Sequence, residues 1–261
     1  MASSLAMAHN YDHLARRWQK VARKNKLAIK EFATVAGYPL LVLRSKPSLR
    51  DLPRIYFSAG IHGDEAAATE GLVEWAENNP EIFREIDATI FPCLNPWGLV
   101  NNSRLDHRGR DLNRCYHAPT QPIRAQIREV EGRTFDVAMM FHEDFDATGI
   151  YIYEIASAKP HWAEKLLTAA TPHVPVDRRN QVEGRAASAG VIRRRIRRNS
   201  MAEWPEAFLL HFQYARRTFT VETPSEFHIQ DRIRAQVAVI EMTMTLALAE
   251  WHASRSSGSA R

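Results

Sequence analysis

The sequence has 261 residues, of which 45% are hydrophobic and 25% charged, with 35 Lys and Arg against 30 Asp and Glu. This balance is typical of a globular protein and excludes a mainly disordered chain, a collagen-like repeat and a small disulfide-stapled scaffold. No apolar run approaches the roughly 20 residues of a membrane-spanning helix, and residues 1–10 lack the layout of a secretory signal. With two cysteines, Cys93 and Cys115, and no CxxC pair, we expect a cytoplasmic protein without a membrane partner.

The formal charge of +5 is unevenly distributed. Five arginines fall within six positions and equal the whole excess: Arg193, Arg194, Arg195, Arg197 and Arg198. Such a run can bind nucleic acid, an anionic surface or an acidic small molecule. The simplest interpretation is a solvated, arginine-rich strand or loop.

Hydrophobic spacing predicts helices and strands in the first half of the chain. In order we expect a helix over Tyr11–Arg23, strands over Leu27–Val35 and Leu40–Leu43 around a turn at Gly37-Tyr38-Pro39, a strand over Arg54–Ala59, a helix over Glu65–Glu77 and a strand over Ala88–Cys93. The first two strands predict a hairpin. The segment from Asn95 to about Pro122 is rich in Asn, Arg, Gly and Pro and is predicted to be a loop.

The same alternation continues in the second half. We expect strands over Phe135–Phe141, Tyr151–Ile155 and Arg217–Val221, and helices over Ala163–Ala170 and Gln230–Trp251. Strands alternating with helices after a hairpin predict an α/β fold, with a mixed sheet covered by helices on both faces. No repeat or long linker divides the chain, so we expect a single domain over residues 1–251 and a disordered tail over 252–261.

Two segments carry candidate metal ligands. His62 and Glu65 lie three residues apart where a predicted strand gives way to a predicted helix, so both can hold one face of a zinc ion. His142 follows the apolar strand Phe135–Phe141 and can supply a third ligand. Three protein ligands and a water form the open coordination of a catalytic zinc. Taken singly, each segment has a non-catalytic interpretation. The HxxE pattern of His62 and Glu65 can arise by chance, and His142 can be a hydrogen-bonded histidine at a sheet edge.

An acidic residue ends a late strand. Glu222 follows the predicted strand Arg217–Val221 and precedes Thr223-Pro224. A carboxylate beside a zinc-activated water can take its proton and later deliver it to a leaving nitrogen. The alternative is a glutamate in an edge salt bridge.

The predicted loop after Asn95 carries several arginines, including Arg104 and Arg114. The planar guanidinium suits a carboxylate. Arg114 beside Asn113 can clamp one anionic group, and Arg104 can reach a developing oxyanion. A solvated charge cluster is the alternative.

Together the segments form an ordered pattern: His62-x-x-Glu65, Asn95-Pro96-x-Gly98, Arg104, Gly109-x-Asp111-Leu112-Asn113-Arg114, His142 and Glu222. This pattern resembles the zinc carboxypeptidases (the funnelins), which show HGxE, NPDG, an arginine seven residues before DLNR, a strand-end histidine and a late strand-end glutamate. The resemblance covers roughly two thirds of the chain and looks like the compact bacterial branch, whose members include murein-peptide amidases. The sequence departs from the pattern at Trp97, where NPDG has aspartate, and at Glu143-Asp144, where digestive members have small polar residues.

The resemblance implies one zinc ion per chain, bound by His62, Glu65 and His142, with Glu222 as general base and acid. It also implies a zinc carboxypeptidase-like catalytic domain over residues 1–251, built on a mixed sheet of about eight strands.

The resemblance further implies roles for the arginine loop. Arg104 would polarise the scissile carbonyl, while Asn113 and Arg114 would hold the free α-carboxylate of a C-terminal residue. The expected reaction is hydrolysis of a C-terminal peptide or amide bond in a small peptide or amino-acid-derived substrate.

Two other functions stay open. Aspartoacylase and succinylglutamate desuccinylase resemble the same HxxE and DLNR signature and cleave N-acyl amino acids, although the spacing within Asn95–Gly98 and Gly109–Arg114 favours the carboxypeptidases. An inactive basic binding module would use the arginine run, but the intact ligand set argues against it, and we expect no nucleic-acid partner. The run falls within Gly184–Glu206, where family members build the pocket for the terminal side chain. We expect it either to select an acidic side chain or to be solvated.

Overall fold

The computed structural model describes residues 7–46, 51–156, 158–199 and 202–258. Within these residues, eight strands form one mixed sheet in the order β1-β2-β4-β3-β5-β10-β6-β9. The strands are β1 (Ala28–Val35), β2 (Tyr38–Arg44), β3 (Arg54–Ala59), β4 (Asp87–Phe91), β5 (Phe135–Asp144), β6 (Tyr151–Ala156), β9 (Val191–Arg193) and β10 (Ala215–Pro224). A separate small hairpin pairs β7 (Gln181–Val182) with β8 (Arg185–Ala186).

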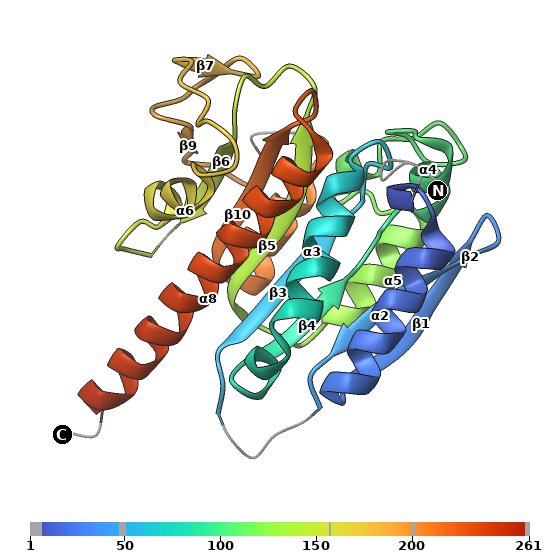
Figure 1. Cartoon of the computed structure of the whole chain (residues 1–261), viewed down its shortest axis with the longest axis horizontal. Helices are drawn as coiled ribbons and strands as arrows, with labels where there is room; N and C mark the ends of the chain where they lie inside the picture. The colour runs from blue at the N-terminus through green and yellow to red at the C-terminus, as the bar shows by residue number, and fades with distance from the viewer. Residues whose placement is uncertain (1–6, 47–50, 157, 200–201, 259–261) are drawn as a thin grey trace.

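Helices cover both faces of this sheet (Figure 1). One face packs against α2 (Tyr11–Asn25), α3 (Ala66–Asn78), α6 (Ala163–Ala170) and α8 (Ile229–Gly258). The other packs against α5 (Gln121–Val130) and the short α7 (Glu206–Leu209). The expected single α/β domain with a mixed sheet between helices is confirmed.

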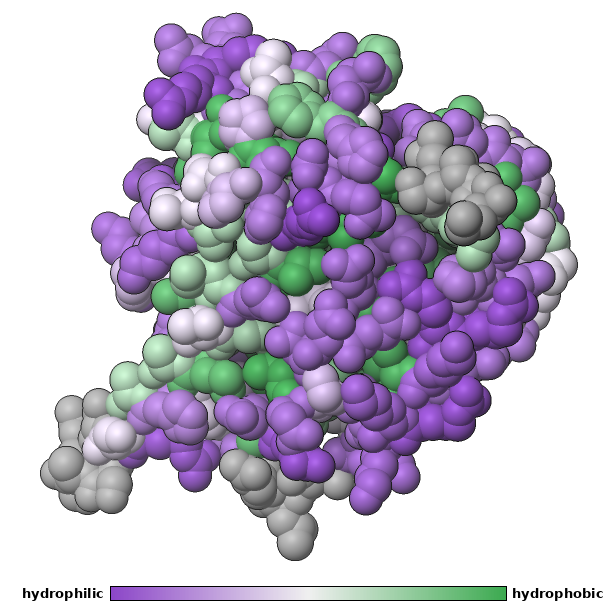
Figure 2. All heavy atoms as spheres, viewed as in Figure 1, coloured by the Kyte–Doolittle hydropathy of each residue, from purple (hydrophilic) through white to green (hydrophobic). Residues whose placement is uncertain are grey.

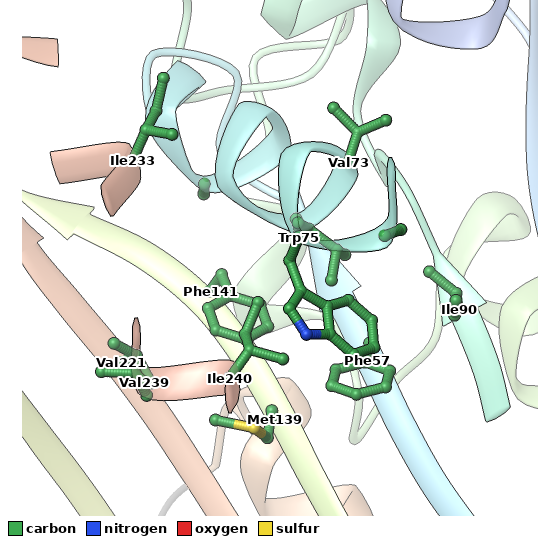
Figure 3. Packing of buried hydrophobic residues seen from close by; sticks show 14 of the residues in the cluster. Phe57, Val73, Trp75, Ile90, Met139, Phe141, Val221, Ile233, Val239 and Ile240 are labelled. Carbon is green, nitrogen blue, oxygen red and sulfur yellow. The ribbon is translucent and has the colours of Figure 1, made fainter. Parts of the chain in front are cut away.

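Side chains of the central strands alternate between two hydrophobic cores. Phe57 of β3 faces α3, where its ring lies 5.1 Å from that of Trp75, whereas Tyr56 faces the opposite core. Figure 3 shows Trp75 directed from α3 onto Phe57, with Ile240 of α8 beside Phe141 of β5. Because the sheet is buried on both faces, its central strands read as continuous apolar runs.

Three adjacent parallel strands bring their carboxyl ends to one edge of the sheet. β5 lies between β3 and β10 and is parallel to both. The register places Ala59 opposite Phe141, and Glu222 opposite His142. Residues that follow these strands therefore meet at the edge where open α/β sheets bind ligands.

The first hairpin turns earlier than predicted. Val35 pairs with Tyr38, so the turn consists of Ala36 and Gly37 alone, both with positive φ (50° and 84°). A two-residue turn of this kind matches the twist of the flanking strands. Tyr38 and Pro39 therefore belong to β2 and not to the turn.

The predicted loop after Asn95 contains helices. α4 (Pro96–Asn101) begins where the Asn95 side chain accepts a hydrogen bond from the Gly98 amide, and a 3₁₀ turn covers Leu112–Arg114. α5 begins at Gln121, inside the segment predicted to be loop. The apolar residues Ile123, Ile127 and Val130 form the face of α5 that packs on the sheet, a spacing that the sequence already displays.

The last helix is longer than predicted. α8 continues to Gly258, so the predicted disordered tail is wrong for residues 252–258, while 259–261 lie outside the described residues. The hydroxyls of Ser254 and Ser256 donate to carbonyls of the preceding turn, and Arg255 pairs with Asp51. The helix thus includes a serine-rich segment whose composition by itself suggests a tail.

The surface seen from the helical side is mainly hydrophilic over α2 and α3, with apolar residues along the C-terminal half of α8 (Figure 2). None of the helices in the described ranges is long and apolar enough to cross a membrane.

Candidate active site

A cavity of about 650 Å³ opens at the carboxyl ends of β3, β5 and β10. All seven residues predicted for the site line it: His62, Glu65, Arg104, Asn113, Arg114, His142 and Glu222. The parallel strands thus bring together side chains that are up to 160 positions apart in the sequence.

The three predicted metal ligands converge at one point. Nδ1 of His62 lies 2.6 Å from Oε1 of Glu65, and Nδ1 of His142 lies 2.9 Å from Oε2 of the same carboxylate. The candidate ligand atoms of the three residues all lie within 4.8 Å of one another, and all three residues are buried. A histidine–glutamate–histidine set with this spacing is consistent with a zinc site.

Asp111 supports the choice of a metal at this point. Its Oδ1 lies 3.1 Å from Nε2 of His62. In the tautomer whose Nε2–H donates to Asp111, Nδ1 directs a lone pair at the Glu65 carboxylate, and a cation bound between the two acceptors satisfies both. Metal-binding histidines commonly donate their second N–H to a carboxylate. The sequence analysis gave Asp111 no role, although Asp111 lies two residues before Asn113 in the Asp111-Leu112-Asn113-Arg114 segment.

The charges of the cluster shift its proton affinities. Burial disfavours the charged form of His62, but the Glu65 carboxylate and hydrogen bonds to Asp111 and Glu65 outweigh it and raise the pKa of His62 to about 9. Burial likewise disfavours ionised Glu65, but His62 and His142 hold its pKa below the usual range. In the absence of metal, protons therefore occupy the position that suits a divalent cation.

Close backbone packing holds the His62 loop in place. A Cβ atom on Gly63 would lie 1.9 Å from the carbonyl carbon of Gly98 in α4, so only glycine fits there. The Gly63 amide also donates to the Ser103 carbonyl. These contacts join the loop that carries His62 to the segment that carries Arg104.

Arg104 lies beside the candidate ligands. Its guanidinium nitrogens are 3.4 Å from Oε1 of Glu65 and 3.2 Å from Oδ2 of Asp111. The side chain is 43% exposed and lines the cavity. A fixed cation at this position can stabilise negative charge that develops on a substrate oxygen.

Asn113 and Arg114 lie on the adjoining wall. Oδ1 of Asn113 accepts from the Glu206 amide at 2.9 Å, and Arg114 donates to the Asn113 carbonyl at 3.1 Å. No ion pair of Arg114 is found within the described residues. Its guanidinium is therefore available to an anionic group in the cavity.

Glu206 is a buried support that sequence reasoning missed. Its carboxylate accepts hydrogen bonds from Tyr56, Ser58 and Gln126. Burial raises the pKa of Glu206, while these hydrogen bonds oppose the rise. The network fixes the start of α7 and, through the backbone amide of Glu206, the side chain of Asn113.

Glu222 lines the cavity from the carboxyl end of β10. It is half-buried, and the described residues offer it no hydrogen bond. Burial raises the pKa of Glu222 well above its usual value; His142 opposes the rise, while Glu65, Glu183 and Asp144 add to it. A carboxylate with raised proton affinity is suited to exchange protons with a substrate.

The catalytic-domain family described as succinylglutamate desuccinylase/aspartoacylase matches residues 51–174. A search of curated proteins gives no match.

Solved structures are similar over almost the whole chain. A candidate metallopeptidase from Shewanella baltica OS155 has 19% identity and a TM-score of 0.81, covering 92% of this chain and 93% of that one. A candidate metallopeptidase from Shewanella amazonensis SB2B has 22% identity and a TM-score of 0.80, covering 90% and 92%. A metallo-carboxypeptidase from Burkholderia cenocepacia has 15% identity and a TM-score of 0.68, covering 90% and 68%. The chain has a zinc carboxypeptidase-like fold.

Within this carboxypeptidase-like fold, Glu143 next to His142 is neutralised internally. Its carboxylate pairs with Arg232 of α8 and accepts from the Ala67 amide at 2.9 Å. The side chain of Glu143 is fully buried. The extra acid after the strand-end histidine therefore ties β5 to the starts of α3 and α8.

Proposed function

We propose that the protein is a zinc-dependent metallocarboxypeptidase that hydrolyses the C-terminal peptide or amide bond of a substrate with a free carboxylate. One observation carries the proposal. A single cavity holds the His62–Glu65–His142 cluster, Glu222 without a hydrogen-bond partner in the described part of the chain, and the guanidinium of Arg114.

The positions of these groups suggest a role for each of them in the reaction. A zinc ion bound by the cluster would supply Lewis acidity and make a water more acidic. Glu222 takes a proton from the attacking water and delivers it to the leaving nitrogen. Arg104 stabilises the negative charge on the former carbonyl oxygen. Arg114 and Asn113 hold the substrate carboxylate, which sets the distance from the chain end to the bond that breaks.

A deacylase of N-acyl amino acids is the second candidate. It is favoured by the match of residues 51–174 to the succinylglutamate desuccinylase/aspartoacylase catalytic domain. Both reactions cleave an amide bond next to a carboxylate-bearing amino acid, so they use the same proposed groups. They differ in the acyl side of the substrate.

A comparison of substrates separates the two candidates. We expect the zinc-loaded protein to hydrolyse benzoyl-glycyl dipeptides with a higher kcat/KM than the matching N-acetyl and N-succinyl amino acids, all assayed at equal concentration. Faster turnover of the N-acyl amino acids would favour the deacylase. Absence of turnover of every substrate by a metal-replete sample would reject both candidates.

Arg114→Ala tests the carboxylate clamp. We expect kcat/KM to fall about 10- to 100-fold on a substrate with a free terminal carboxylate, because a charge-assisted hydrogen bond is lost. The same substrate with an amidated terminus should lose little. Arg108→Ala, an exposed arginine of the same segment outside the cavity, is the matched control. Equal losses on both substrates would count against the clamp.

A further inference from the structure

Two side chains that the proposed mechanism does not use, Asp64 and Phe145, also line the cavity. Asp64 lies in the loop between β3 and α3, directly before Glu65. Phe145 follows β5, three residues after His142. Because β3 and β5 are adjacent and parallel, both residues lie at the same edge of the sheet as the candidate metal ligands.

Asp64 is an exposed acid without a cationic partner. No ion pair of Asp64 is found in the described ranges, and Arg104, beside the same cluster, pairs with Glu65 and Asp111 instead. A divalent ion bound by the cluster and this guanidinium would together balance the carboxylates of Glu65, Asp111 and Glu222. The charge of Asp64 is then left over, so its carboxylate is available to a cationic group of the substrate.

Phe145 is held at the rim of the cavity with most of its surface exposed. It is 71% exposed, whereas the other exposed large hydrophobic residues among those described are 36–40% exposed. The preceding carboxylate, that of Asp144, accepts hydrogen bonds from the Tyr151 hydroxyl and the Asp146 amide, each at 2.9 Å. These bonds fix the backbone beside Phe145. They also satisfy the acid next to it, which leaves Asp64 as the candidate to bind a cation.

The two residues lie on a different wall from the proposed carboxylate clamp. That clamp consists of Asn113 and Arg114, and the Asn113 side chain is held by the first residue of α7. The loop that carries Asp64 packs instead on α4, where Gly63 meets Gly98. When the clamp holds the carboxylate-bearing residue, the acyl part of the substrate is the part left to reach this second wall.

We propose that Asp64 binds an ammonium group on the acyl side of the substrate, with Phe145 in contact with the same acyl residue, so that the preferred substrates are dipeptides with a free amino terminus. The inference rests on the proposed function, in which Arg114 holds the carboxylate. A carboxylate binds an ammonium group through a charge-assisted hydrogen bond, and an aromatic ring attracts a cation or packs on the carbon atoms around it.

The position of Asp64 suits an α-ammonium group. Consecutive Cα atoms are ~3.8 Å apart, so Asp64 lies within one residue of the ligand Glu65. The α-ammonium of an unblocked dipeptide is likewise only two bonds from the carbonyl carbon that is attacked. An N-acetyl group carries no charge at this position, and an N-succinyl group adds a negative charge that Asp64 repels. The inference therefore favours the peptidase over the deacylase.

A matched pair of substrates isolates the ammonium group. Phenylalanyl and 3-phenylpropanoyl groups on the same amino acid differ only by the ammonium, and both are assayed with the zinc-loaded full chain at pH 7, where α-amino groups are mainly protonated. We expect kcat/KM to be at least about 10-fold higher for the phenylalanyl dipeptide, in line with a charge-assisted pair. Asp64→Asn should remove most of this preference, and Asp64→Glu should restore part of it. Asp146→Asn, which changes an exposed acid outside the cavity, is the matched control and should keep the preference.

Phe145→Ala tests the aromatic contact. Glycyl and phenylalanyl dipeptides with the same terminal residue share the ammonium and differ in the acyl side chain. We expect the wild type to favour the phenylalanyl dipeptide about 5-fold, because its ring covers apolar surface, and Phe145→Ala to lose this advantage. Equal turnover of the two dipeptides by the wild type would contradict a contact with Phe145.

The outcomes separate this inference from the function on which it rests. The preference is a ratio within each variant, so a change in zinc content affects both substrates alike. Equal kcat/KM for the phenylalanyl and phenylpropanoyl substrates, or a preference that Asp64→Asn retains, would overturn the inference and leave the hydrolase proposal standing. If neither substrate is hydrolysed, calorimetric titration of the zinc-loaded protein with the same pair still tests the site. Tighter binding of the dipeptide, lost in Asp64→Asn, would support it, and equal affinities would overturn it.

Discussion

Glu222→Gln is expected to lower kcat by about 10²- to 10⁴-fold, the usual contribution of a general acid–base, while the protein retains one zinc ion per chain. Glutamine keeps the shape of the side chain but cannot take up a proton from water. Glu222 lies outside the cluster formed by His62, Glu65 and His142, so metal binding should survive. Steady-state kinetics together with metal analysis of the same sample measure both quantities.

Glu226→Gln is the matched control for this prediction. Glu226 follows β10 by two residues and is exposed outside the cavity, so the same change of charge should leave kcat near that of the wild type. A Glu222→Gln protein that is fully loaded with zinc and turns over at the wild-type rate would remove Glu222 from the mechanism.

His142→Ala is expected to reduce the bound zinc well below one ion per chain and to abolish hydrolysis. Only His62 and Glu65 would remain as ligands. A catalytic zinc ion is held by three protein ligands, with a water in the fourth position. A ligand that binds only the folded protein stabilises it, by about 2.7 kcal/mol when its concentration is 100 times Kd. Wild-type protein should therefore unfold at a higher Tm when zinc is added, and His142→Ala should not.

The zinc-induced change in Tm is measured within each variant. The space left by the missing imidazole affects Tm with and without zinc alike. The comparison within one variant therefore separates this effect on Tm from the loss of metal binding. His252→Ala, on the exposed C-terminal part of α8, is the control and should keep both the metal and the rise in Tm. Full zinc occupancy of His142→Ala, with a normal rise in Tm, would show that the metal binds elsewhere.

Much of the fold could be predicted from local patterns. The predicted bounds of β3 and α6 agree with the structure, because β3 is a run of buried residues after Arg54 and the buried residues of α6 recur at helical spacing. α5 was missed although it has an amphipathic spacing, since the predicted loop runs to about Pro122 and no helix or strand was predicted between that loop and Phe135. The length of α8 could not be predicted from composition, because the polar residues after Trp251 lack the apolar spacing of a helix although the backbone stays helical to Gly258.

The residues predicted for the site line one cavity for a shared physical reason. His62, His142 and Glu222 each come where an apolar strand ends, and parallel strands place such ends at one edge of a sheet. Strand ends can be identified from sequence, and so can the separation of Arg104 from Asp111. The choice of these seven residues rested on motif order and on the resemblance to the zinc carboxypeptidases, neither of which needs tertiary information.

The sequence by itself thus determined the fold class, the candidate ligands and the residues around the cavity, because these depend on local hydrophobic patterns and on motif order. Only the tertiary structure decided what each supporting side chain contacts: Asp111 reaches His62, and Glu206 holds Asn113. It also decided that Arg193 is neutralised while Arg194 enters the cavity. A one-residue step along a strand reverses the face, and the face is set by pairing with strands that are distant in the sequence.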